Sequence, residues 1–211
     1  VTLQEGDRIT IRRGPWGSGT YLVFVVHRQA GTWLGSAATH ALSGLGGGAL
    51  RAGQEVVIEG ARVLADGAIP CPVWARPRAE VGVVLGPQDR FFGADRIEVL
   101  LGATFRLTDA YDRMGVRLRG PSLAPEAALA IPSEAVLRGS IQVAGDGVAA
   151  VLLADHQTTG GYPKIATVVD SDLDGFVQLR PHAAVAFRAL TPDRAVAARR
   201  ARAQALARML G

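Results

Sequence analysis

The sequence has few of the residues that build disulfide frameworks, metal sites or membrane spans. Its 211 residues include one cysteine, Cys71, which excludes a disulfide network and a metal site made only of cysteines. The longest apolar run, residues 21–26, is too short to cross a bilayer, and no signal-peptide pattern opens the chain. Hydrophobic residues make up 48% of the chain, enough to bury a core. We therefore expect a cytoplasmic globular protein that holds no metal.

Lysine is almost absent as well. Of 23 basic residues 22 are arginine, and the single lysine is Lys164. The net charge of +4 arises in residues 191–211, which hold five arginines and one acid, whereas residues 1–190 hold 18 basic and 18 acidic residues. A nucleic-acid-binding protein needs a basic face that replaces counterions, and the body of this chain has no such excess. The charge distribution therefore argues against a nucleic-acid partner.

The first part of the chain predicts a partial β lobe over residues 1–65. Residues 1–12 alternate around a tight turn, and residues 20–26 are a β-branched and aromatic run typical of a buried strand. Residues 55–58 predict a further short strand. Three prolines in residues 66–79 favour an extended linker after this lobe.

A second strand-rich block covers residues 80–190, where short apolar runs alternate with glycine-rich turns. Its clearest strands are predicted at residues 81–85, 104–107, 115–118, 149–153, 165–169 and 184–187. Short helices are predicted at residues 94–101 and 173–179. Many short strands with few helices indicate a mainly β protein built as a barrel or a sandwich.

The strongest helix prediction is the basic C-terminal segment, residues 191–211. Thr191 is a suitable N-cap, Pro192 fits the first helical position, and Asp193 suits the positive end of the helix dipole. Its apolar stripe is weak and consists of Val196, Ala203, Leu206 and Leu210. This pattern favours a solvated or loosely docked helix, and the alternative is a helix that docks on an acidic partner.

The most unusual stretch is residues 155–165, which reads Asp-His-Gln-Thr-Thr-Gly-Gly-Tyr-Pro-Lys-Ile between two predicted core strands. Paired glycines let a ligand approach the backbone amides, Tyr162 offers a hydroxyl, and Lys164 offers an amine. Composition alone is equally compatible with a tight structural turn. Three other segments have the same mixed character and are typical of polar turns when taken singly: residues 86–92, 111–115, and 133–134 with 138–143.

Together these four segments closely resemble the allophanate hydrolase subunit 2 family. That family includes the C-subunit proteins of 5-oxoprolinase, the antagonist of a sporulation-kinase inhibitor and the carboxyltransferase domain of urea carboxylase. The matching motifs lie at residues 85–89, 112–118 with 120–121, 139–143 and 155–166. The run Gln-Thr-Thr-Gly-Gly-Tyr-Pro is highly specific, and the resemblance covers residues 1–190, most strongly from residue 80 onward.

The first block departs from the family pattern in two places. Val26 and His27 stand where the family usually has two glycines, and Ala37 stands where it usually has arginine. Family members also begin well before Val1, so we expect this chain to start inside the first lobe.

The resemblance implies two linked β-barrel lobes, the second cyclophilin-like, followed by a C-terminal α-helix. It leaves three functions open: a subunit of an ATP-dependent 5-oxoprolinase complex acting on a small lactam or amide, which we prefer; a biotin-dependent carboxyltransferase acting on urea or a related amide; and a non-catalytic regulatory module that antagonises a kinase inhibitor. Nothing in the chain resembles a biotinylation domain or an ATP site. Either enzyme would therefore need a sister subunit 1-like chain together with a 5-oxoprolinase partner subunit or a biotin carboxylase. Carboxybiotin would be delivered by a partner, and ATP would bind on a partner.

The same resemblance implies the site residues. Carboxyl transfer from carboxybiotin to a urea nitrogen needs proton transfer and donors for developing oxyanions. The expected catalytic residues are Lys164, Tyr162 and Asp155. The expected substrate-binding residues are Gln157, Thr158, Gly160, Gly161, Gln142, Arg113 and Met114. Lys164 and Tyr162 would donate hydrogen bonds, Asp155 would orient a base or bind an N–H group, and Arg113 would hold a carboxylate.

Overall fold

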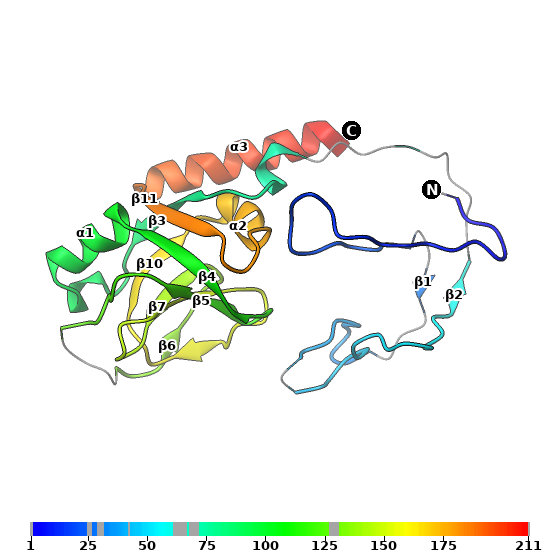
Figure 1. Ribbon diagram of the computed structural model, residues 1–211, viewed down its shortest axis with the longest axis horizontal. Coiled ribbons are helices and arrows are strands. Elements are labelled where there is room, and N and C mark those ends of the chain that lie inside the picture. Colours follow the sequence, from blue (N-terminus) through cyan, green and yellow to red (C-terminus); the bar gives the residue numbers. More distant parts are fainter. Residues whose placement is uncertain are drawn as a thin grey trace. The chain divides into compact units, whose positions relative to one another are not determined.

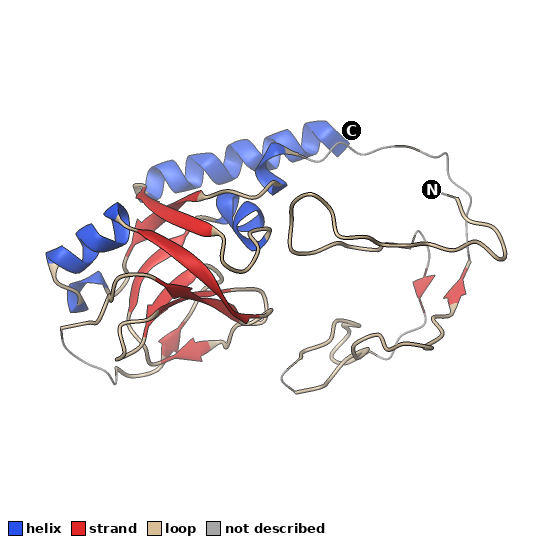
Figure 2. Ribbon diagram, viewed as in Figure 1, coloured by secondary structure: helices blue, strands red, loops and turns tan. Residues whose placement is uncertain are grey.

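The computed structural model describes residues 2–24, 27–28, 32–41, 43–60, 67, 72–126 and 131–210. The chain divides into two compact units, one made of residues 1–13 and 19–70 and the other of residues 14–18 and 71–211. Figures 1 and 2 show that the second unit carries nearly all the regular secondary structure. No helix in the described part of the chain is both long and apolar enough to span a bilayer.

The second unit is a closed β barrel with the strand order β10-β3-β11-β4-β5-β8-β7. The strands are β3 (Glu80–Leu85), β4 (Thr104–Tyr111), β5 (Gly115–Arg119), β7 (Ser140–Val143), β8 (Ala149–Leu152), β10 (Lys164–Val168) and β11 (Ala184–Ala189). Neighbouring strands are antiparallel, except that β11 pairs with β3 in parallel. The six strands predicted for residues 80–190 all form, which confirms the mainly β fold class.

One strand of the barrel was not predicted. The segment expected to be a polar turn at residues 138–143 contains β7, and all four residues of β7 are buried. Ser140 and Gln142 are its polar members, and they obscure the alternation that marks a half-buried strand. β7 pairs with both β8 and β10, so the barrel could not close without it.

The barrel core follows from period-two alternation along the strands. Val81 and Val83 of β3 are fully buried, and Phe105 of β4 packs at 5.8 Å from Phe187 of β11, measured between ring centroids. Phe176 from the helix after β10 is also fully buried. Burial of these side chains from different strands stabilises the closed sheet.

In the part of the chain that is described, three α-helices cover the barrel: α1 (Ala94–Gly102), α2 (Asp170–Val177) and α3 (Pro192–Leu210). They confirm the predicted helices, although α2 begins three residues before the predicted start. Asp170 and Asp172 stand in the first turn of α2, where carboxylates interact favourably with the positive end of the helix dipole. At the start of α3 the Arg194 amide donates to the Thr191 hydroxyl at 3.3 Å, so Thr191 is the N-cap as predicted.

The face that α3 turns toward the rest of its unit is not the predicted apolar stripe. Val196 is 47% exposed, Leu206 is 37% exposed and Ala203 is exposed, while the side chain of Leu210 lies outside the described residues. The half-buried positions are Ala195, Ala198, Arg202, Ala205 and Met209, which recur at intervals of three and four residues. The small alanine side chains allow α3 to pack closely, and the charged side chain of Arg202 makes polar contacts with α2.

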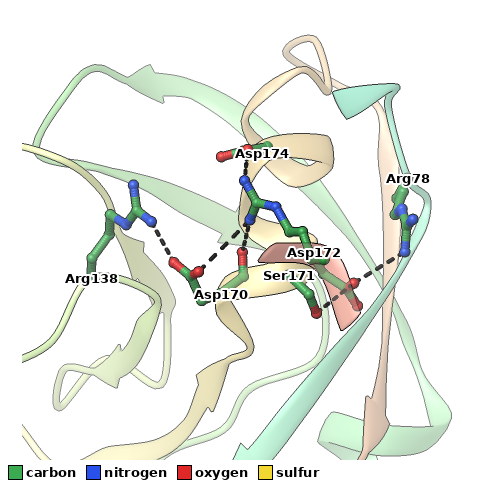
Figure 3. Close-up of polar contacts among 7 residues, drawn as sticks. Arg78, Arg138, Asp170, Ser171, Asp172 and Asp174 are labelled. Atoms are coloured by element: carbon green, nitrogen blue, oxygen red, sulfur yellow. Dashed lines mark hydrogen bonds and ion pairs between the residues drawn. The ribbon is translucent and has the colours of Figure 1, made fainter. Parts of the chain in front are cut away.

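Arg202 of α3 contacts two residues of α2. Its guanidinium donates to the backbone oxygen of Asp170 at 2.7 Å and pairs with the Asp174 carboxylate. Figure 3 shows the carboxylates of α2, with Asp170 also receiving a hydrogen bond from Arg138 at 2.6 Å. The contacts of α3 with α2 therefore include the polar contacts of Arg202, which the hydropathy pattern of α3 does not reveal.

A short early segment, residues 14–18, belongs to the second unit. Arg180 donates to the backbone oxygens of Gly17 and Gly14 at 2.9 and 2.6 Å. The Ser18 hydroxyl donates to the backbone oxygen of Leu179 at 2.6 Å. These contacts join residues about 160 positions apart in the sequence, which no local pattern predicts.

The first unit has little regular structure in its described residues. Its strands there are β1 (His27–Arg28) and β2 (Ile58–Glu59), which pair with each other. The strand predicted at residues 20–26 is wrong for residues 20–24, because Tyr21 is 85% exposed and no partner strand pairs with it. Residues 25–26 lie outside the described residues. The strands predicted within residues 2–12 are also absent, and the one predicted at 55–58 is reduced to β2, since unpaired strands are not stable.

The phenol of Tyr111, at the end of β4, makes the stability of the second unit depend on pH. Burial raises the pKa of Tyr111 above the ordinary value of 10.0, and a hydrogen bond with Ser18 offsets this only in part. The phenol donates to the backbone oxygen of Val177 at 2.6 Å. The folded chain therefore holds this proton more tightly than the unfolded chain.

We expect the free energy of unfolding to keep this contribution below about pH 10 and to lose it as the pH rises through the folded pKa of Tyr111. Chemical denaturation at a series of pH values from about 8 to about 11 measures the loss. Tyr111→Phe keeps the ring but removes the proton, so its curve should fall less steeply. Equal slopes for the two proteins would show that Tyr111 is not the responsible group.

Candidate functional site

The specific motif forms a loop between β8 and β10 that carries a short strand of its own. This strand, β9 (Thr159–Gly160), pairs with β6 (Glu134–Ala135) in a two-stranded sheet outside the barrel. The Val136 amide extends the pairing by donating to the backbone oxygen of Thr158 at 3.1 Å. We call this pair of strands the β6–β9 ribbon. It places Glu134 directly opposite Gly160 of the motif.

Lys164 is the first residue of β10 and lies opposite Gln142 of β7. It is 1% exposed, although lysine is rarely buried unless it is paired. Its Nζ has no hydrogen-bond partner in the described part of the chain. The nearest carboxylate oxygen is Oε2 of Glu134 at 3.9 Å. The single lysine is therefore a buried amine whose hydrogen-bonding capacity is unused.

Gln88 holds the backbone around this amine. Its side-chain oxygen accepts from the Lys164 amide at 3.0 Å, and its own backbone amide donates to the Lys164 carbonyl at 3.2 Å. Its Nε2 also donates to Oε2 of Glu134 at 2.6 Å. Gln88 is 1% exposed, so it is a fixed element of the site. Neither Gln88 nor Glu134 was predicted as a site residue, although Gln88 stands in the matching motif at residues 85–89 and Glu134 in the polar segment at residues 133–134.

The motif amides form a second set of contacts beside Lys164. Gln157 Nε2 donates to Oε1 of Gln142 at 3.1 Å, and Gln142 Nε2 lies 3.4 Å from the backbone oxygen of Tyr162. A Cβ on Gly160 would lie 2.7 Å from Gln142 Nε2, so a residue larger than glycine would displace this amide. Gln142 is 5% exposed and Tyr162 is 51% exposed.

Two further predicted residues belong to the same ribbon and loop. Thr158 contributes its backbone oxygen to the ribbon, as described above. Gly161 lies against the backbone of the preceding segment, since an added Cβ would be 3.1 Å from the Ile131 oxygen. The structure thus brings Lys164, Gln142, Gln157, Thr158, Gly160, Gly161 and Tyr162 into one region.

Arg113 and Asp155 form a separate pair. Arg113 donates from Nε and Nη2 to the two oxygens of Asp155, each at 2.8 Å, and the Asp155 amide donates to the Arg113 carbonyl at 2.7 Å. Met114 beside them accepts from the Leu153 amide through its backbone oxygen at 2.9 Å. No hydrogen bond or ion pair joins Lys164 to Asp155 in the described part of the chain. A bidentate pair of this kind fixes the loop between β8 and the motif.

Two hollows of about 360 and 500 Å³ lie elsewhere, around α3. The larger is lined by β3, β10 and the first turns of α3, and neither hollow is lined by a predicted site residue. The Nζ atom of Lys164 is itself inaccessible to solvent. Among the described residues, no group of three or more His, Cys, Asp or Glu side chains is arranged to hold a metal ion.

The hydrogen-bond donors around Lys164 indicate which reactions this region could assist. A buried ammonium without a hydrogen-bond acceptor stabilises an oxyanion far more strongly than a solvated one, because water does not screen it. The neighbouring glutamine amides add neutral donors and acceptors. The region therefore suits reactions in which negative charge develops on a carbonyl oxygen.

Curated relatives carry one name, that of the C-subunit of 5-oxoprolinase. The chain is 44% identical over 89 residues to this protein from Haemophilus influenzae, a match that covers 42% of this chain and 29% of that protein. It is 28% identical over 192 residues to the protein of the same name from Escherichia coli, a match that covers 85% of this chain and 58% of that protein. The matches thus span less than two thirds of the length of either relative.

Solved structures show the same fold. The protein TTHA0988 matches with a TM-score of 0.64 and 33% identity, over 74% of this chain and 30% of that one. The urea amidolyase of Kluyveromyces lactis matches with a TM-score of 0.67 and 22% identity, over 80% of this chain and 12% of that one. At that identity the second likeness supports the fold alone.

The family model described as carboxyltransferase domain, subdomain A and B, matches residues 1–189. This range includes the whole barrel, the β6–β9 ribbon and the buried lysine. The chain belongs to the carboxyltransferase domain family, subdomains A and B.

Proposed function

We propose that this chain is a subunit of an ATP-dependent 5-oxoprolinase complex in the cytoplasm, and that the region around Lys164 is its share of the active site. The observation that carries the proposal is the match of 85% of the chain to a protein named as the C-subunit of 5-oxoprolinase. The buried amine of Lys164, which has no hydrogen-bond acceptor in the described residues, supports the position of the site. ATP would bind on a partner subunit, and a sister subunit 1-like chain would complete the assembly.

The chemistry of a lactam explains why such an amine would be useful. When water adds to the lactam carbonyl, its oxygen gains negative charge, and the C–N bond then breaks as the nitrogen gains a proton. Lys164 would donate a hydrogen bond to the charged oxygen. Gln142 and Gln157, whose side chains are joined by a hydrogen bond, would orient the amide group of the substrate.

The family model favours a second candidate, a biotin-dependent carboxyltransferase. The donor set fits the carboxylate or ureido oxygen of carboxybiotin, because the Lys164 ammonium has no acceptor in the described residues and the side chain of Tyr162 is half-exposed. When bound, carboxybiotin would supply the carboxyl group that is transferred to the acceptor nitrogen. Lys164 and Tyr162 would then hold oxygens in place and exclude water around them.

The test is ATP turnover by the reconstituted subunits, with 5-oxoproline and urea offered separately. We expect ADP and glutamate to form with 5-oxoproline, and to stop forming when this chain is left out of the mixture. Turnover with urea that is blocked by avidin would instead identify the carboxyltransferase. Turnover with neither substrate would contradict both enzymes and favour a regulatory module.

A further inference from the structure

The Glu134 carboxylate near Lys164 is far more exposed to solvent than the lysine side chain itself. Lys164 is buried, whereas the side chain of its ion-pair partner Glu134 is 51% exposed. The distance of 3.9 Å from Nζ to Oε2 leaves the ammonium without a hydrogen bond. A carboxylate that served only to neutralise a buried amine would gain by approaching to hydrogen-bond distance. Glu134 is thus a half-exposed carboxylate close to the buried amine that makes no hydrogen bond to it.

The Glu134 carboxylate is hydrogen-bonded to Gln88 and not to Lys164. Oε2 of Glu134 accepts from Gln88 Nε2 at 2.6 Å, and Gln88 is bound on both sides to the Lys164 backbone. The carboxylate is therefore hydrogen-bonded to a neutral amide while it lies 3.9 Å from the amine. When Glu134 moves away, an oxygen of the incoming anion can accept from Gln88 Nε2 in its place, so this buried amide is not left without an acceptor.

The backbone beneath Glu134 is also easy to displace. The β6–β9 ribbon has two residue pairs, Glu134 with Gly160 and Ala135 with Thr159, and it lies outside the closed barrel. Lys164 itself lies on β10, which pairs with two barrel strands. Segments with few hydrogen bonds open locally at a much smaller free energy than strands of a closed barrel. The cover can therefore move while the amine stays in place.

We propose that Glu134 is a displaceable counter-ion that covers Lys164, and that an anionic ligand, a carboxylate or an oxyanion, reaches the amine by replacing it. This inference rests on the proposed role of Lys164 in the site. Glu134 is a positioning residue, since it acts through Lys164. The negative charge of the ligand is required because it takes over the charge that Glu134 supplies.

The single lysine allows a direct test. The chain has two kinds of primary amine, its α-amino group and Lys164, so reductive methylation with formaldehyde followed by peptide mapping reads the accessibility of Lys164 alone. We expect slow labelling of the wild-type chain and labelling about tenfold faster in Glu134→Ala, which removes the cover. Glu134→Gln keeps the size of the cover but loses its charge, so its rate should be intermediate.

The matched control is Glu98→Ala, which truncates an exposed glutamate of α1, a helix that is not part of the ribbon. It should label at the wild-type rate. Thermal unfolding of each variant checks that labelling is compared among folded proteins. If Lys164 labels equally slowly in both Glu134 variants, or equally fast in the wild-type chain, Glu134 is not the cover and the proposal is overturned.

A kinetic readout tests the requirement for an anion in the assembled complex. Glu134→Gln removes the competing carboxylate, so we expect KM for 5-oxoproline to fall several-fold with kcat nearly unchanged. A loss of kcat with no fall in KM would contradict the counter-ion role. If 5-oxoproline is not turned over at all while the labelling order holds, the proposed function fails and the cover role stands.

Discussion

Replacing Lys164 with methionine should lower turnover by the assembled complex about 10²- to 10³-fold, the usual effect of removing one donor to a developing oxyanion. Methionine has nearly the same length and fills the same space, so the neighbouring packing is kept. The loss should appear in kcat, because the amine acts on charge that develops during the reaction. Steady-state kinetics with the partner subunits in excess measure it.

Stability should separate this effect from damage to the fold. The amine is buried without a hydrogen bond, and removing such a group is close to neutral or stabilising. We therefore expect the thermal midpoint of Lys164→Met to equal or exceed that of the wild-type protein. Arg138→Met, which removes an exposed cation paired with Asp170, is the matched control and should keep full turnover. Wild-type turnover by Lys164→Met would exclude a catalytic role for this residue.

Replacing Asp172 with alanine should lower the free energy of unfolding by about 3 kcal/mol. The Asp172 side chain is 11% exposed and accepts from the Gly82 amide of β3 at 2.8 Å and from Arg78 at 3.1 Å (Figure 3 shows the pair with Arg78). Truncation leaves a buried backbone amide without its acceptor and Arg78 without its partner. Chemical denaturation followed by far-UV circular dichroism measures the change, since the signal arises mainly from the second unit.

The same helix provides the control. Asp174 lies two residues further along α2 and pairs with Arg202, but its side chain is 40% exposed. Exposed ion pairs contribute little, so Asp174→Ala should cost less than about 1 kcal/mol. Equal losses in the two variants would show that burial of Asp172 is not the decisive factor. Asp172 and Asp174 lie on the same helix but differ in burial, so a difference in stability between the two variants measures the effect of burial.

Most of the secondary-structure predictions that the structure confirms rest on patterns among neighbouring residues. The strands of the second unit follow from β-branched and apolar runs bounded by glycine turns, and α3 follows from its cap and its helix formers. These signals are carried by neighbouring residues and need no partner. β7 is the exception in the barrel, because its buried polar residues Ser140 and Gln142 hide the alternation.

The predictions for the first unit failed for a different reason. An apolar run becomes a strand when a second strand supplies its hydrogen bonds. In the described residues of the first unit, β1 and β2 are the only paired strands, and two isolated bridges join Trp33 to Ser36 and His40 to Leu45. Tyr21 therefore lies exposed although its segment has high β propensity. A high β propensity favours a strand only where a second strand is available to pair with it.

The sequence by itself determined that this protein is mainly β, that its basic charge lies in one terminal helix, and that its only lysine stands in its most specific motif. Only the tertiary structure decided what surrounds that lysine. Gln88 bonds to the Lys164 backbone across 76 positions of sequence and to Glu134 across 46. Such contacts depend on which strands the barrel brings together, and no local periodicity encodes them. Lys164 lies on a barrel strand with its amine buried, and the ribbon carries the carboxylate that lies 3.9 Å from that amine.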